Sequence, residues 1–315
     1  MRKKRCRRNF APECQRRDCV NRSIVRLPAR SRLDEKGANF LTPEMQSQFT
    51  LFLQTVAKAS QAVLFLDYDG TLAPFHARRD QAYPYPGVAL VLQEIVRNGK
   101  TRLVIISGRD ATEILPLLNL QPRPEVWGVH GLQRLKSDGT MEMQHLDERT
   151  LDGLSDADRW LGYQQLRHTA EFKAGSIAVH WRGLSEADAE DLRQRVLLGW
   201  RPIAEHSGLD LLTFDGGVEI RAFAADKGVA VRTFLSEISS ETPAAYLGDD
   251  TTDESAFRAM LGRGISVLVR PKWRQTAAEW WLKPPDELLD FLGQWLKACV
   301  EHDAFEGGRA AAVNG

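Results

Sequence analysis

Asp67 and Asp69 stand directly after a short apolar run and before Gly70-Thr71. The run, residues 62–66, is typical of a strand buried on both faces of a parallel sheet. Residues two apart on an extended segment point the same way, so both carboxylates can face one site. Paired carboxylates repel each other unless a cation or a shared proton intervenes, which favours a hard metal ion such as Mg²⁺. A solvated turn is the alternative, because Asp and Gly are common in turns.

Four other residues that could handle a phosphate group end predicted strands or begin a predicted helix. They are Ser107, Lys227, Asp249 and Asp253. Open α/β sheets bind ligands outside the carboxyl ends of their strands, so we expect all four at one sheet edge, beside the paired aspartates. Each also has a purely structural interpretation, as a helix cap or as a solvated lysine.

Together these residue types can transfer a phosphoryl group. One carboxylate can attack phosphorus and form an aspartyl-phosphate, while a second protonates the leaving alcohol and then deprotonates the attacking water. A hydroxyl and an ammonium can hold the phosphate oxygens, and distant aspartates can complete the oxygen shell that Mg²⁺ prefers. The sequence therefore predicts a phosphoryl-transfer site that uses Mg²⁺.

Strands and helices alternate in two stretches of the chain, which predicts an α/β fold with a doubly wound, Rossmann-like parallel sheet. The predicted strands are 62–66, 103–106, 126–131, 244–247 and 265–269, and the predicted helices are 43–59, 86–98, one ending near 118, 227–238 and 286–298. Between them the pattern changes to short alternating strands at 175–181, 209–214 and 218–223, with a polar helix at 185–198. This change predicts a smaller inserted α+β domain.

We therefore expect four parts along the chain. They are a basic, disordered tail at 1–44, a catalytic core at 45–134 and 223–300, the inserted domain at 135–222, and a frayed end at 301–315.

The charge of the chain is balanced overall but unevenly distributed. Residues 1–32 contain twelve Lys or Arg against two acidic residues, which leaves 30 basic and 40 acidic residues in the remainder. The alternatives for this segment are a transit peptide, an arm that binds nucleic acid or an anionic surface, and an extension that precedes a true start at Met45. It has few aromatic residues, so we expect no nucleic-acid partner.

Cysteine usage and hydropathy indicate a cytoplasmic protein. The four cysteines match no zinc template and are too few for a disulfide scaffold, so we expect free thiols in a reducing compartment. No apolar run is long enough to span a bilayer, so we expect no membrane partner.

Four motifs resemble those of haloacid-dehalogenase-like phosphatases, in order and at similar spacing. They are Asp67-Tyr-Asp-Gly-Thr71, Ser107-Gly-Arg109, Lys227-Gly228 and Gly248-Asp-Asp-Thr-Thr-Asp253. The resemblance implies that Asp67 is the nucleophile, that Asp69 is the general acid and base, and that Lys227 assists catalysis. It also implies a Mg²⁺ site formed by Asp67, the main-chain carbonyl of Asp69, and Asp249, with Asp253 acting directly or through water.

Further motifs resemble the trehalose-6-phosphate phosphatases within that superfamily. They are Asp67-Tyr-Asp-Gly-Thr-Leu-Ala-Pro74, Gly128-Val-His-Gly131, Glu171-Phe-Lys173, His180-Trp-Arg182 and Glu219-Ile-Arg221. This resemblance implies that the inserted domain is a cap over the core. It implies the following residues as the substrate- and phosphate-binding set: Asp67, Tyr68, Asp69, Thr71, Ser107, Gly108, Arg109, His130, Glu171, Lys173, Arg182, Glu219 and Lys227.

The implied reaction is hydrolysis of trehalose 6-phosphate to trehalose and phosphate, the last step of trehalose biosynthesis, with a trehalose-phosphate synthase as a candidate partner. Two alternatives remain open. The same chemistry could act on another sugar phosphate, such as sucrose 6-phosphate or a mannosyl-phosphoglycerate. The chain could also be a non-catalytic sensor of sugar phosphates.

Overall fold

The computed structural model describes residues 43–76, 78–214 and 216–313, with side chains from 46 to 300. The first helix, α1, begins at Pro43. The expected basic tail therefore lies outside the described residues, except for its last two positions. All of the candidate site residues lie inside them.

The main sheet contains six parallel strands and two antiparallel strands at one edge. Its strand order is β12 (Trp280–Leu282), β11 (Ile265–Val269), β10 (Ala244–Gly248), β1 (Ala62–Leu66), β2 (Thr101–Ile106), β3 (Glu125–Gly128), β4 (Gln133–Leu135) and β5 (Met141–Met143). Because β1 lies between β10 and β2, the carboxyl ends of three neighbouring strands meet at one edge. This confirms the predicted α/β class.

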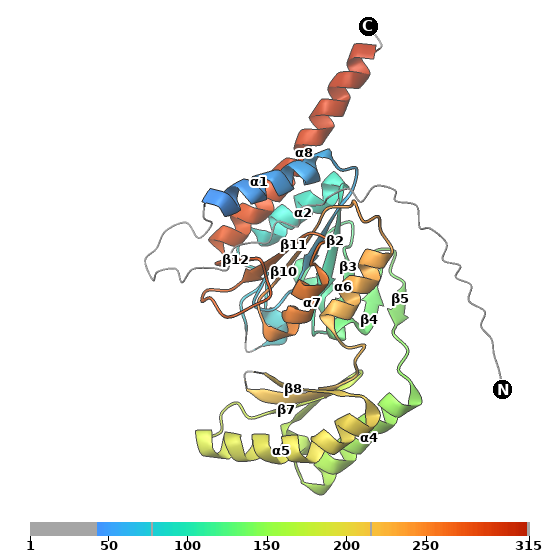
Figure 1. The fold of residues 1–315 in the computed structure, drawn as a ribbon, viewed down its shortest axis with the longest axis vertical. Coiled ribbons are helices and arrows are strands. Elements are labelled where there is room, and N and C mark those ends of the chain that lie inside the picture. Colours follow the sequence, from blue (N-terminus) through green and yellow to red (C-terminus); the bar gives the residue numbers. More distant parts are fainter. Residues whose placement is uncertain (1–42, 77, 215, 314–315) are drawn as a thin grey trace, which may run out of the picture. The chain divides into compact units, whose positions relative to one another are not determined.

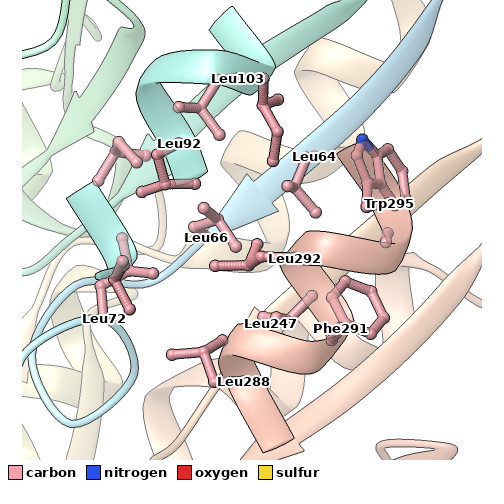
Figure 2. Packing of buried hydrophobic residues seen from close by; sticks show 14 of the residues in the cluster. Leu64, Leu66, Leu72, Leu92, Leu103, Leu247, Leu288, Phe291, Leu292 and Trp295 are labelled. Carbon is pink, nitrogen blue, oxygen red and sulfur yellow. The ribbon is translucent and has the colours of Figure 1, made fainter. Parts of the chain in front are cut away.

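Helices cover both faces of this sheet (Figure 1). They are α1 (Pro43–Lys58), α2 (Val88–Asn98), α3 (Ala111–Leu118) and α8 (Asp286–Val313) on one face, and α6 (Lys227–Ser236) and α7 (Glu254–Ala259) on the other. Strand β1 supplies both cores in alternation. Leu64 and Leu66 pack with Leu292 and Trp295 of α8 (Figure 2), whereas Phe65 packs against α6 on the opposite face.

The part of the chain between α4 (Glu148–Tyr163) and α6 contains a second, antiparallel sheet. Its order is β6 (Ala170–Lys173), β7 (Ser176–His180), β9 (Gly217–Arg221) and β8 (Asp210–Phe214). One face packs against α4 and α5 (Glu186–Ser207) through alternate apolar residues such as Val179 and Val218. The other face carries polar side chains, among them Glu171 and Glu219. Period-two alternation therefore turns those polar residues away from the helices.

Several element boundaries differ from the sequence-based expectation. Helix α5 continues past position 198 to Ser207, because Trp200 is fully buried among helix and sheet residues despite Pro202 within the helix. Strand β3 ends at Gly128, because Val129 and His130 adopt positive φ and form a turn. Helix α8 continues beyond 298 to Val313.

The edge of the main sheet also extends further along the chain than expected. Strand β5 lies within 135–222 yet pairs with β4, through a turn in which Lys136 N donates to Thr140 O and Gly139 has a φ of +92°. The chain therefore leaves the main sheet after Met143. Within the described ranges, no helix combines the length and the apolar character needed to cross a membrane.

Candidate active site

A cavity of about 300 Å³ lies at the carboxyl ends of β1, β2 and β10. Its lining combines residues of those strand ends, such as Asp67 and Ser107, with residues of the second sheet, such as Glu171 and Glu219. The two sheets therefore contribute to one site. This is the sheet edge at which the sequence predicted a ligand.

Lys227 connects the first and last of the predicted catalytic segments. Its Nζ donates to Oδ1 of Asp67 at 2.6 Å and to Oδ1 of Asp253 at 2.8 Å, and all three side chains are buried. Asp67 follows β1, and Lys227 opens α6, where the carboxylate of Asp226 caps the helix by accepting from Val229 N. The cap thus fixes the start of the helix that presents the lysine.

A third buried carboxylate, Asp249, lies beside the two that bond to Lys227. Oxygen atoms of Asp67, Asp249 and Asp253 all lie within 4.8 Å of one another. Burial raises the pKa of Asp67 to about 7. The charge of Lys227 opposes this increase, and the charge of Asp253 adds to it. Burial, reinforced by the charges of Asp67 and Asp253, also raises the pKa of Asp249 well above its usual range. The excess of negative charge suits a divalent cation with oxygen ligands.

The carboxylates differ in how far the protein itself satisfies them. Asp253 accepts hydrogen bonds from Lys227, from the Tyr246 hydroxyl, and from the main-chain nitrogens of Asp249 and Asp250. Within the described part of the chain, the carboxylate of Asp249 accepts none. The donor set therefore fits a metal that Asp67 and Asp249 ligate, with Asp253 holding the lysine and the loop in place.

Gly70 leaves the room that Asp249 occupies. Its φ is +83°, in the region that favours glycine, and a Cβ placed there would lie 2.1 Å from Oδ2 of Asp249. The glycine in the Asp-x-Asp-Gly segment thus serves both the tight turn and the approach of the carboxylate.

Asp69 is held by Arg109. Both of its oxygens accept from the guanidinium, at 2.6 Å from Nε and 2.5 Å from Nη2. The same arginine also donates from Nη1 to the main-chain oxygen of Arg79 at 2.5 Å. Arg109, which we expected to bind substrate, therefore orients a catalytic candidate in this structure.

Ser107 and His130 form the wall of the cavity beside β2. The Ser107 hydroxyl accepts from Arg109 N at 3.2 Å, and a Cβ on Gly108 would lie 2.6 Å from the His130 ring. Burial, and then the nearby charges of Lys227 and other cations, lower the pKa of His130 well below its usual value. The imidazole is therefore neutral at pH 7, and its buried Nδ1 has no partner among the described residues.

The second sheet presents a charged group of side chains to the same cavity. The carboxylate of Glu171 lies 3.1 Å from Nε2 of His180, 3.6 Å from Nζ of Lys173 and 2.7 Å from Nη1 of Arg79. The hydrogen bond to His180 lowers the pKa of Glu171 to about 2, assisted by the charges of Lys173 and Arg79 and opposed by burial. Arg182 and Glu219 also line the cavity.

Three expected site residues do not line the cavity, and one of them is Asp253, which is fully buried and accepts from Lys227 as described above. The Tyr68 side chain is fully buried and its hydroxyl donates to Ala82 O at 2.7 Å. Thr71 is also buried, and its Oγ1 donates to Oδ2 of Asp67 at 3.1 Å, so it orients that carboxylate from beneath the cavity.

Several residues that line the cavity were not predicted from the sequence. Among them are Phe75, His76, Arg79, His180 and Phe214. The first three lie in the loop after β1, outside any motif, and only the register of β7 and β8 places the other two beside it. His180 stood in the motif His180-Trp-Arg182, and Asp250 and Thr252, which also line the cavity, stood in the motif Gly248-Asp-Asp-Thr-Thr-Asp253, so these three had a signal in the sequence.

Comparison with known proteins gives one family. Residues 65–285 match the family model described as trehalose-phosphatase. A probable trehalose-phosphate phosphatase 3 of Oryza sativa is 28% identical, over 78% of this chain and 72% of its own length. A trehalose-phosphate phosphatase of Mycobacterium marinum is also 28% identical, over 73% of this chain and 60% of its own. The chain spans only 20% of the length of two Mycobacterium tuberculosis relatives described as uncharacterized glycosyl hydrolases, which are 29% identical to it.

Solved structures give the same fold. The Candida albicans trehalose-6-phosphate phosphatase C-terminal domain aligns with a TM-score of 0.66 at 18% identity, over 79% of this chain and 96% of its own. A haloacid dehalogenase-like hydrolase from Bacillus subtilis aligns with a TM-score of 0.53 at 16% identity, over 74% of this chain and 99% of its own. The fold is that of the haloacid-dehalogenase-like hydrolases. The family match covers well over half of the sequence, so the chain belongs to the trehalose-phosphatase family.

Proposed function

We propose that this chain hydrolyses trehalose 6-phosphate to trehalose and inorganic phosphate with the help of Mg²⁺. The observation that carries the proposal is the Lys227 bridge between Asp67 and Asp253, which lies at a cavity that the second sheet lines with sugar-binding residue types. Family membership supports the choice of substrate. A synthase partner and a cytoplasmic location stay predictions.

In the proposed reaction, an oxygen of Asp67 attacks phosphorus and the bond from phosphorus to the sugar oxygen breaks. Asp69 gives its proton to the leaving sugar oxygen. Asp69 then takes a proton from water as that water attacks the aspartyl-phosphate, which releases phosphate and restores the Asp67 carboxylate. Each oxygen of Asp69 accepts one hydrogen bond from Arg109 here and keeps a second lone pair that can carry the proton.

The remaining residues bind and orient. Lys227 and Ser107 hold the transferring phosphoryl oxygens and offset their charge. Asp67 and Asp249, with the main-chain oxygen of Asp69, would hold Mg²⁺, while Asp253 fixes the ammonium. When bound, the metal supplies positive charge beside the phosphate oxygens.

The second sheet would act as a cap that reads the sugar. Charged donors and acceptors such as Glu171, Lys173, Arg182 and Glu219 discriminate among the hydroxyls of a disaccharide by charge-assisted hydrogen bonds. Glu171, Lys173 and Glu219 lie on one face of the second sheet and Arg182 follows β7, so together with the strand ends of the core they can hold both ends of a sugar phosphate.

Phosphate release from a panel of esters tests the proposed function. With purified protein and Mg²⁺, we expect trehalose 6-phosphate to be hydrolysed at least about tenfold faster, in kcat/KM, than sucrose 6-phosphate or glucose 6-phosphate. EDTA should abolish release and added Mg²⁺ should restore it. Preference for another sugar phosphate would keep the catalytic chemistry and reject the substrate, while no release from any ester would favour a sensor.

Exchange of Gly70 tests the placement of Asp249. Gly70→Ala would drive a methyl group into the Asp249 carboxylate, so we expect the Mg²⁺ concentration for half-maximal activity to rise at least about tenfold. Gly99→Ala is the matched control, because Gly99 also has a positive φ, of +79°, but a Cβ there meets nothing within 4 Å. The control should lose a little stability and keep its Mg²⁺ dependence. Equal behaviour of the two variants would contradict the assignment.

Glu171→Gln tests how the cap reads charge. The variant should lose about tenfold in kcat/KM on trehalose 6-phosphate and little on p-nitrophenyl phosphate, which has no sugar. Because the pKa of Glu171 is lowered, the contribution of its negative charge to sugar binding is complete above the pKa of Glu in the unfolded chain. That contribution is lost only as the pH falls towards about 2. The ratio of wild-type to variant kcat/KM should therefore stay level between about pH 5 and pH 8. A ratio of wild-type to variant kcat/KM that decreases as the pH is lowered from about 8 to about 5 would show that Glu171 titrates in that range.

A further inference from the structure

Arg79 joins two parts of the site that lie far apart in the chain. It begins the short η1 helix (Arg79–Gln81) in the loop between β1 and α2, and it lines the cavity. Its Nη1 donates to Oε1 of Glu171 on β6 at 2.7 Å, across 92 residues of sequence. The side chain thus connects the core to the second sheet at the mouth of the proposed sugar site.

The main chain of Arg79 is tied to the catalytic loop as well. Its carbonyl oxygen accepts from Nη1 of Arg109, and Arg109 holds both oxygens of Asp69. Arg79 therefore contacts two residues of the site. Its main chain contacts Arg109, which orients Asp69, and its side chain contacts Glu171. A shift of this residue would act on both ends of a bound sugar phosphate.

Neutralisation of the Glu171 carboxylate does not by itself require Arg79. That carboxylate also lies beside His180 and Lys173, which remain when Arg79 is removed. The Arg79 side chain is 50% exposed, and ion pairs at such exposure contribute little to stability. What Arg79 adds is direction, because it fixes Oε1 of Glu171 while His180 holds Oε2.

We propose that Arg79 is a positioning residue that sets Glu171 against the sugar, and that it thereby helps to select sugar phosphates over small phosphate esters. The inference rests on the proposed function. It extends that function to a residue outside every motif, in a loop whose main chain also supports Asp69 through Arg109.

Steady-state kinetics of Arg79→Ala test the inference on two substrates. These are the sugar phosphate that the wild type hydrolyses best, and p-nitrophenyl phosphate. For the sugar phosphate we expect kcat/KM to fall about tenfold, mainly through KM, while p-nitrophenyl phosphate changes by less than about twofold. In a Glu171→Gln background, Arg79→Ala should add little further loss, because the two act as a pair.

Two other variants separate position from charge. Arg78→Ala removes the neighbouring arginine, which pairs with Asp80 at 2.9 Å and does not line the cavity, so both substrates should be unaffected. Arg79→Lys keeps the charge but loses the forked geometry, so it should recover only part of the loss.

Four results would overturn the inference. Equal losses on both substrates would make Arg79 a support of the loop alone. A gain in kcat/KM on the sugar phosphate would mean that the ion pair blocks the sugar site, and no effect would mean that Glu171 needs no partner. A wild type that hydrolyses p-nitrophenyl phosphate but no sugar phosphate would reject the proposed function itself, and the inference with it.

Discussion

The buried ammonium of Lys227 is the interaction on which the site depends. Three carboxylates are gathered where β1 and β10 end, and one lysine lies hydrogen-bonded between two of them. Without that cation the burial of so much negative charge would be costly. The lysine is in turn fixed by its helix, whose cap, Asp226, also pairs with Arg221 of β9 at 2.9 Å. The start of α6 therefore connects the second sheet to the buried carboxylates of the site.

Two carboxylates of the cavity that lie outside the Asp67, Asp249 and Asp253 group are paired within the chain. Asp69 is held by Arg109, and Glu171 by Arg79 with His180 and Lys173. These partners are the groups that a phosphate and a sugar would engage, so binding would exchange internal pairs for contacts with the ligand. In the proposed function, phosphoryl chemistry belongs to the core and sugar recognition to the second sheet, and the loop that contains Arg79 joins the two.

Much of the fold and of the site could be predicted from the sequence because simple rules govern them. Unbroken apolar runs identified β1 and β11, and the strand-end rule predicted that Asp67 and Asp249 would lie together. The rules fail where tertiary packing decides. The end of α5 depends on the burial of Trp200, and Arg79 reaches Glu171 only through the geometry of two distant segments. Tyr68 stands between the two aspartates, yet the alternation of the segment buries its side chain.

The most direct test of the account is the turnover of an Asp67→Asn variant on the substrate that the wild type prefers. The amide keeps the shape of the carboxylate but is a poor nucleophile, so we expect kcat to fall by at least about a thousandfold. The melting temperature, measured without divalent cations, should not fall, because burial already disfavours the charged form of Asp67. Asp80→Asn, at an exposed aspartate of the following loop, is the matched control and should retain activity. Normal turnover by the Asp67→Asn variant would contradict the assignment of Asp67 as the nucleophile and, with it, the role given to the Lys227 bridge.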